Sequence, residues 1–115
     1  MAFTELEKKR IEKSASHFIE KNRPPAHIRP ELDLGFRVTG QSIEIFEIRP
    51  VWKAKHQKQE RPVAKATYIK SHEIWRVYWQ RADLKWYRYE PVPDVESIND
   101  FLNVVEQDEY RCFWS

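Results

Sequence analysis

The sequence predicts an α+β domain in which an N-terminal and a C-terminal helix pack on the same face of a five-stranded, largely antiparallel sheet. Three observations lead to this fold class. Residues 4–22 and 97–108 space their apolar side chains as helices do, residues 32–48 and 74–89 alternate apolar and polar residues as hairpins do, and residues 63–70 form one linking run with β character. A chain of 115 residues is expected to fold as a single domain, 1–115, without needing a disulfide or a metal.

The first helix is predicted over Thr4 to Asn22. Thr4 and Glu7 have the spacing of a capping box, in which each side chain accepts a hydrogen bond from the other residue's backbone N–H. Pro24 follows the helix and cannot continue it, because proline lacks the backbone donor. The stripe predicted to face the sheet consists of Leu6, Ile11, Ala15, Phe18 and Ile19.

The first hairpin follows a proline-rich segment and turns near Gly40. A register with Phe36 opposite Ile43 and Leu34 opposite Ile45 would bury all four side chains on one face of the sheet. The reverse face would then carry Asp33, Arg37, Glu44, Phe46 and Ile48.

Residues 49–61 are predicted to leave the sheet as a mobile basic loop. Pro50 cannot donate a ladder hydrogen bond, and the residues after it are polar, with Glu60 as their one acid. Flexible lysines contact phosphates with little geometric demand, although an ordinary solvated crossover has the same composition. The cations of this loop after Pro50 are Lys53, Lys55, Lys58 and Arg61.

The second hairpin holds three of the five tryptophans and three of the five tyrosines. A two-residue turn at residues 82–83 would pair Trp79 with Trp86 and Tyr78 with Tyr87. The expected core face carries Trp75, Val77, Trp79, Leu84 and Trp86, and the expected solvent face carries Arg76, Tyr78, Gln80, Lys85, Tyr87 and Tyr89.

Two interpretations of that solvent face remain open. Tyrosines beside cations are typical of platforms on which the bases of single-stranded nucleic acid stack. Tyrosine is also common in strands for structural reasons alone, since cross-strand aromatic pairs stabilise a sheet by about 0.2–1 kcal/mol each.

The last part of the chain is predicted to form a helix that begins at Ser97 and ends near Asp108, with Phe101 among its buried residues. The tail after it contains Phe113 and Trp114. Such a tail is too apolar to remain in solvent, so we expect it to dock on the core.

Charge is distributed unevenly along the chain. Residues 1–89 hold 19 Lys and Arg against 11 Asp and Glu, whereas residues 90–115 hold 1 against 7. A basic patch for a polyanion and an acidic patch for a basic partner are both compatible with this distribution. With a single cysteine, Cys112, and no long apolar run, the sequence favours a cytoplasmic protein without membrane contact.

The sequence offers little support for catalysis. Two glycines are too few for a glycine-rich phosphate loop, and the four histidines lie in different predicted elements, so neither a cofactor nor a metal site is expected. Asp33 on one strand and Glu47-Ile48-Arg49 on the next resemble distantly the paired carboxylates of Mg²⁺-dependent nucleases. Arginine replaces the lysine of that arrangement, and the predicted register sends Asp33 and Glu47 to opposite faces.

Several short motifs occur in the order of a known bacterial family. They are Arg49-Pro50-Val51-Trp52, Pro62-Val63-Ala64-Lys65, Trp75-Arg76-Val77-Tyr78, Trp86-Tyr87-Arg88-Tyr89 and Phe113-Trp114. In these motifs the chain resembles the family called domain of unknown function 3024. The resemblance implies a small bacterial cytoplasmic protein and supplies no catalytic residue.

The sequence therefore favours a non-enzymatic binding module whose partner is nucleic acid or a ribonucleoprotein. A protein-interaction module or homodimer, with exposed tyrosines and arginines as anchors, is the alternative. The predicted ligand-binding residues are Arg76, Tyr78, Lys85, Tyr87 and Tyr89 on the sheet and Lys53, Lys55, Lys58 and Arg61 in the basic loop.

Overall fold

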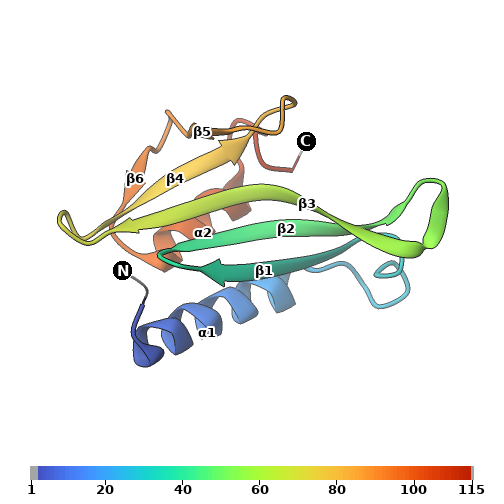
Figure 1. Cartoon of the computed structure of the whole chain (residues 1–115), viewed down its shortest axis with the longest axis horizontal. Coiled ribbons are helices and arrows are strands. Elements are labelled where there is room, and N and C mark those ends of the chain that lie inside the picture. The colour runs from blue at the N-terminus through green and yellow to red at the C-terminus, as the bar shows by residue number, and fades with distance from the viewer. Residues whose placement is uncertain (1–2, 115) are drawn as a thin grey trace.

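The computed structural model describes residues 3–114, with the exception of the Lys55 side chain. Two helices lie on one face of an antiparallel sheet with the strand order β1-β2-β3-β4-β5, and β6 pairs with β4 beside β5 (Figure 1). This arrangement confirms the predicted α+β fold. The elements are α1 (Glu5–Asn22), β1 (Asp33–Thr39), β2 (Ser42–Val51), β3 (Ala54–Ile69), β4 (Ile74–Gln80), β5 (Trp86–Arg88), β6 (Asp94–Val95) and α2 (Ile98–Gln107).

The helices begin where the sequence predicts. The Thr4 hydroxyl accepts from the Glu7 backbone N–H at 3.2 Å, and the Glu7 carboxylate accepts from the Thr4 N–H at 2.8 Å, which completes the capping box of α1. Ser97 caps α2 by accepting from the Asp100 N–H at 3.1 Å. Of the stripe predicted on α1, Leu6 is exposed. Ile11, Ala15, Phe18 and Ile19 are buried and join Phe101, Leu102 and Val105 of α2 in the core.

The first hairpin forms with a register that differs from the predicted one by two residues. Phe36 lies opposite Ile45, and Leu34 lies opposite Glu47, because the strands pair up to Thr39 and Ser42 and leave a two-residue turn. Gly40 in that turn has a φ of 59°, a conformation that glycine adopts without strain. A shift of two residues keeps every side chain on its predicted face. Leu34, Ile43 and Ile45 are buried as predicted and Phe36 is partly buried, but Phe46 on the opposite face is buried as well.

The prediction of a mobile loop over residues 49–61 is wrong. β2 continues to Val51 and β3 begins at Ala54, so this segment is a two-stranded ribbon that projects beyond the rest of the sheet (Figure 1). Proline is tolerated because β1 pairs with β2 only as far as Ile48, which leaves Pro50 on an edge strand, next to a register irregularity. We call residues 49–61 the ribbon.

Within the described residues, no helix is long and apolar enough to cross a membrane.

Gly35 is required by a close approach across the β1–β2 pair. A Cβ atom at this position would lie 2.7 Å and 2.9 Å from two ring carbons of Phe46. The ring has little room to move, because it is 6% exposed and the Arg37 guanidinium lies 4.8 Å from its centroid. The ring therefore occupies the space that a side chain on residue 35 would need.

We expect Gly35→Ala to lower the free energy of unfolding by about 1–3 kcal/mol, the usual cost of overpacking. Urea denaturation of the variant measures this loss. Gly40→Ala is the matched control, since no atom lies within 4 Å of the added Cβ and only backbone strain of about 1 kcal/mol applies. A smaller cost of Gly35→Ala in a variant that already has a smaller residue at position 46 would confirm the steric cause. An unchanged stability of Gly35→Ala would contradict it.

Candidate functional site

The loop between β4 and β5 is longer than the predicted two-residue turn. It runs from Arg81 to Lys85 and is held by Asp83, whose carboxylate accepts from the Lys85 backbone N–H at 2.9 Å and from the Tyr87 hydroxyl at 2.5 Å. Leu84 adopts a φ of 64°, and its N–H donates to the Arg81 carbonyl at 2.8 Å. The loop therefore adds residues that a minimal turn does not have.

The longer loop changes the pairing of the hairpin by one residue. Trp79 lies opposite Tyr87 and Gln80 lies opposite Trp86, whereas the prediction paired Trp79 with Trp86. A shift of one residue turns every side chain of one strand to the other face. The placement of Tyr87 and Tyr89 on the solvent face is therefore wrong, and so is the placement of Trp86 in the core.

Both displaced tyrosines have structural partners on the helix side. Tyr89 is 1% exposed and its ring centroid lies 4.8 Å from that of Phe113. Tyr87 lies under the Arg81 guanidinium, 4.6 Å from its ring centroid, and Arg81 also lies 5.1 Å from the Trp79 ring. The hydrogen bond to Asp83 raises the pKa of Tyr87, and burial raises the pKa of Tyr89.

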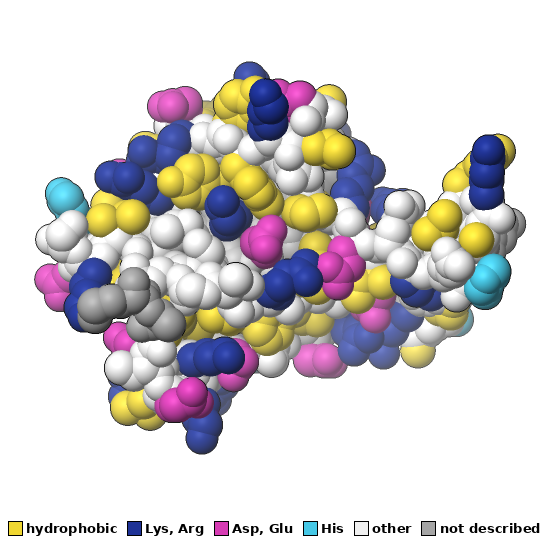
Figure 2. All heavy atoms as spheres, viewed as in Figure 1, with side chains coloured by type: hydrophobic (Ala, Val, Ile, Leu, Met, Phe, Trp, Pro, Cys, Tyr) yellow, Lys and Arg dark blue, Asp and Glu magenta, His cyan; other side chains and the backbone are white. Residues whose placement is uncertain are grey.

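The opposite face of the sheet is uncovered over the part of the chain that the structure describes, and we call it the open face (Figure 1). Lys65 on β3 places its ammonium group 5.0 Å from the Tyr78 ring centroid and 4.9 Å from that of Trp86. Figure 2 shows hydrophobic side chains gathered over β3 and β4 with Lys or Arg side chains among them. The cross-strand register across this face gives the rows Arg37, Glu44, Lys65, Tyr78, Arg88 and Thr39, Ser42, Thr67, Arg76, Asp94.

Two arginines of the open face, Arg76 and Arg88, lie near Asp94. Arg88 donates to Asp94 at 3.0 Å, and Arg76 lies opposite Asp94 in the register. The Nε atoms of both arginines are buried and have no hydrogen-bond partner among the residues described. An unsatisfied guanidinium donor is costly in protein interiors, so these two groups have donor capacity that the folded chain does not use.

Phe46 belongs to the open face by register but is not available to a ligand. Its ring is buried beneath Arg37, which in turn donates to Glu60 at 2.6 Å and lies 3.7 Å from Glu44. The available aromatic groups of this face are therefore those next to Lys65.

The structure separates the predicted ligand-binding residues into three places. Arg76 and Tyr78 lie on the open face as predicted, whereas Tyr87 and Tyr89 lie on the helix side and Lys85 lies in the exposed hairpin loop. The remaining predicted residues belong to the ribbon. There Lys53 lies 5.9 Å from the Trp52 ring centroid, Lys58 donates to the Pro30 carbonyl, Arg61 pairs with Glu47 in the register, and the Lys55 side chain is outside the described part of the structure.

Three residues of the open face were not predicted from the sequence: Lys65, Trp86 and Arg88. The period-two pattern of β3 contains the signal for Lys65, because Ala64 and Ala66 on either side of it are fully buried. No comparable local signal places Trp86 and Arg88, since their face depends on the length of the preceding loop.

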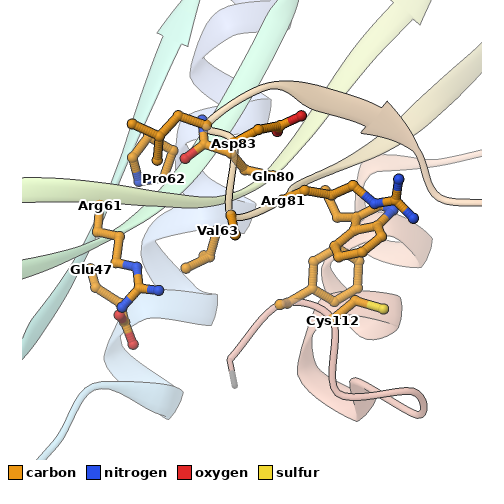
Figure 3. A pocket seen from close by; sticks show the side chains of 12 residues that line it. Glu47, Arg61, Pro62, Val63, Gln80, Arg81, Asp83 and Cys112 are labelled. Atoms are coloured by element: carbon orange, nitrogen blue, oxygen red, sulfur yellow. The ribbon is translucent and has the colours of Figure 1, made fainter.

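A groove of about 660 Å³ lies on the helix side, between the hairpin loop and the C-terminal tail (Figure 3). Glu47 lines it and is the one buried charged side chain among those described. Its carboxylate accepts from Arg49 Nε at 3.2 Å, and Figure 3 shows the Arg61 side chain next to it, as the register requires. Glu47 and Arg61 lie at one end of the groove, and Arg81 lies beside Cys112 at the other (Figure 3).

The carboxylate pair of the nuclease hypothesis is not assembled. Leu34 lies opposite Glu47, so Asp33 and Glu47 face opposite sides of the sheet, as their predicted register requires. Asp33 is bonded to Arg23 at 2.6 Å and 3.1 Å. Burial opposes ionisation, but these bonds and the Leu34 N–H lower the pKa of Asp33. Among the described side chains, no group of three metal-ligating residues is close enough to hold an ion.

Comparison with known proteins agrees with the resemblance seen in the aromatic motifs. No curated protein and no solved structure matches the chain. A family model matches residues 3–115 and therefore spans both helices and the whole sheet. The chain belongs to the family described as the domain of unknown function DUF3024.

Proposed function

We propose that the protein is a non-enzymatic module that binds single-stranded nucleic acid on its open face. The observation that carries the proposal is the ammonium group of Lys65, which lies within 5.0 Å of the ring centroids of both Tyr78 and Trp86 on a face that neither described helix covers. Aromatic rings stack on any base, and cations beside them contact the phosphates, which is how single strands are bound without sequence selection.

The charges of the open face favour a polyanion. Arg37, Lys65, Arg76 and Arg88 lie in the two cross-strand rows with only Glu44 and Asp94 as acids. The unpaired Nε donors of Arg76 and Arg88 would find acceptors in phosphate oxygens after a small rotation of the side chains. Hydrogen bonds between guanidinium and phosphate are charge-assisted and stronger than neutral ones.

Lys65 caps the two rings in the free protein, so binding requires its displacement. An exposed cation–π contact contributes about 0.5–1 kcal/mol, whereas a base stacked on an aromatic side chain contributes about 1–3 kcal/mol. Replacing the ammonium group by a base on these rings is favourable, because the ammonium group can then contact a neighbouring phosphate. The bound nucleic acid would therefore run across the sheet from Trp86 toward Lys65.

The test is fluorescence anisotropy with labelled 12-nucleotide dT and U oligomers at low salt. We expect Trp86→Ala and Tyr78→Ala each to weaken binding by a factor that corresponds to about 1–3 kcal/mol, the loss of one base stack. Tyr110→Ala is the control, since Tyr110 is 60% exposed but lies in the C-terminal tail. Circular dichroism establishes that the variants are folded. The absence of binding to either oligomer at low salt would refute the proposal.

A salt titration of the same complexes tests the charged part of the site. If Lys65, Arg76 and Arg88 each neutralise one phosphate, the logarithm of the association constant should fall with the logarithm of salt concentration with a slope of about −2. Arg76→Gln should make that slope shallower by about 0.7. A slope near zero would show that the cations do not contact phosphates.

A protein-interaction module or homodimer is the second candidate. Large apolar side chains that remain exposed favour it, namely Trp52 at 82%, Leu84 at 75% and Tyr110 at 60%. Tryptophan and tyrosine are enriched at the energetic centres of protein interfaces. Light scattering across protein concentrations distinguishes the candidates, because an apolar self-association persists in high salt whereas phosphate contacts weaken.

A further inference from the structure

The tip of the ribbon exposes the most accessible large apolar side chain reported above. Trp52 is 82% exposed and lies in the turn between β2 and β3, where the Lys53 ammonium group is 5.9 Å from its ring centroid. A tryptophan in this position gains little from folding, since most of its surface remains in water. Figure 1 shows that the ribbon carries it away from the helices and the other strands. The position suits contact with a separate molecule.

The charge of the ribbon is opposite to that of nucleic acid. Residues 49–61 contain five Lys and Arg against one acid, Glu60. That acid is already bonded to Arg37 at 2.6 Å, and among the described cations of the ribbon Arg49 is the one in an ion pair, with Glu47 at 3.2 Å. A cationic strand pair with an aromatic tip fits a polyanion that also offers stacked bases.

We infer that the ribbon enters the major groove of a B-form duplex, and that the partner is a DNA junction whose single-stranded part lies on the open face. This inference rests on the proposed function. The major groove of B-form DNA is about 12 Å wide and admits a two-stranded ribbon, whereas the corresponding groove of A-form RNA is too narrow for it. Trp52 would stack against a base at or near the end of the ribbon, and Lys53 would contact a phosphate.

The length of β3 connects the two surfaces. Lys65 on the open face and Ala54 at the ribbon tip belong to the same strand and are eleven residues apart. At about 3.3 Å per residue the distance is roughly 35 Å, which is close to one turn of B-form DNA. A stem of about ten base pairs next to the single strand would therefore reach the tip.

The experiment compares three labelled probes in the anisotropy assay: a 12-nucleotide single strand, the same strand joined to a 12-base-pair DNA stem, and the same strand joined to an RNA stem. We expect the DNA stem to strengthen binding by at least about tenfold and the RNA stem to give a much smaller gain. Trp52→Ala should weaken binding of the DNA junction by about 5- to 150-fold, the loss of one base stack, and leave single-strand binding unchanged. Lys53→Ala should reduce the salt slope for the DNA junction by about 0.9.

The outcomes separate this inference from the proposed function. Single-strand binding that depends on Trp86, without any gain from the DNA stem, would overturn the role of the ribbon and leave the open face intact. An increase in affinity from the DNA stem that neither Trp52→Ala nor Lys53→Ala reduces would also overturn the role of the ribbon. Binding of the DNA junction that requires Trp52, in the absence of binding to the single strand alone, would support the ribbon and refute the open face. Because Trp52 and Lys53 are exposed, neither variant is expected to affect folding.

Discussion

Tyr89→Ala is expected to lower the free energy of unfolding by about 3–5 kcal/mol, which is the usual cost of removing a buried aromatic ring. Tyr89 is 1% exposed, contacts Phe113, and closes the side of the core between β5 and the C-terminal tail. Chemical denaturation monitored by circular dichroism measures the loss. Since small domains are stable by only about 5–15 kcal/mol, the variant should be partly unfolded at modest urea concentrations.

Two comparisons make this result specific to the corrected hairpin register. Tyr89→Phe keeps the ring in the core and should change stability by less than about 1 kcal/mol. Tyr78→Ala removes a half-buried tyrosine from the open face and should cost clearly less stability than Tyr89→Ala. If Tyr89→Ala proved as stable as the natural protein, Tyr89 would face solvent and the original two-residue turn would be correct.

The helices and the helix-facing side of β1, β2 and β4 could be predicted from sequence because their signals are local. Thr4 and Glu7 are three residues apart, and Ile11, Ala15 and Phe18 repeat at helical spacing, so each observation needs only one turn of chain. The first hairpin kept its faces despite a wrong register, because the error was two residues and side chains alternate with that period.

The candidate site could be predicted only in part because its composition depends on a loop. Asp83 binds both the Lys85 N–H and the Tyr87 hydroxyl, and this local network lengthens the connection beyond the two residues assumed. The additional length places Trp86, instead of Tyr87, on the open face. The period-two pattern does not contain this information, because an aromatic-rich alternating strand is compatible with burial of either face.

The ribbon was missed for a different reason. Proline within a run of alternating residues usually ends a strand that has neighbours on both sides, and the prediction applied that rule to Pro50. The rule does not apply to a strand with a free edge, and Pro50 lies beyond the last residue of β2 that β1 contacts. Deciding this case requires knowing where the neighbouring strand begins, which is a property of the tertiary structure.

The docked tail confirms the prediction that Phe113 and Trp114 pack on the core, and Asp108 holds it in place. The Asp108 carboxylate accepts from the backbone N–H groups of Phe113 and Trp114, both at 3.1 Å, and the Trp114 indole donates to the Val105 carbonyl at 2.8 Å. Asp108 itself has a φ of 40° at the end of α2. One residue therefore ends the helix in a left-handed conformation and fixes the segment that forms a wall of the groove.

Asp108→Ala is expected to cost about 2–4 kcal/mol, since it removes the acceptor of two partly buried N–H groups and places alanine in a left-handed conformation. Asp108→Asn should cost less, because asparagine tolerates that conformation and keeps one carbonyl acceptor.

The Cys112 thiol provides a second readout of the same variant. Burial raises its pKa, and the Asp108 charge raises it further, so releasing the tail and removing the charge should both lower the pKa. Alkylation by iodoacetamide near pH 8 should therefore be faster in Asp108→Ala than in the natural protein, because more thiolate is present and the sulfur is more accessible. An unchanged alkylation rate in a destabilised variant would mean that the tail stays docked without Asp108, and that its apolar contacts with the core are sufficient.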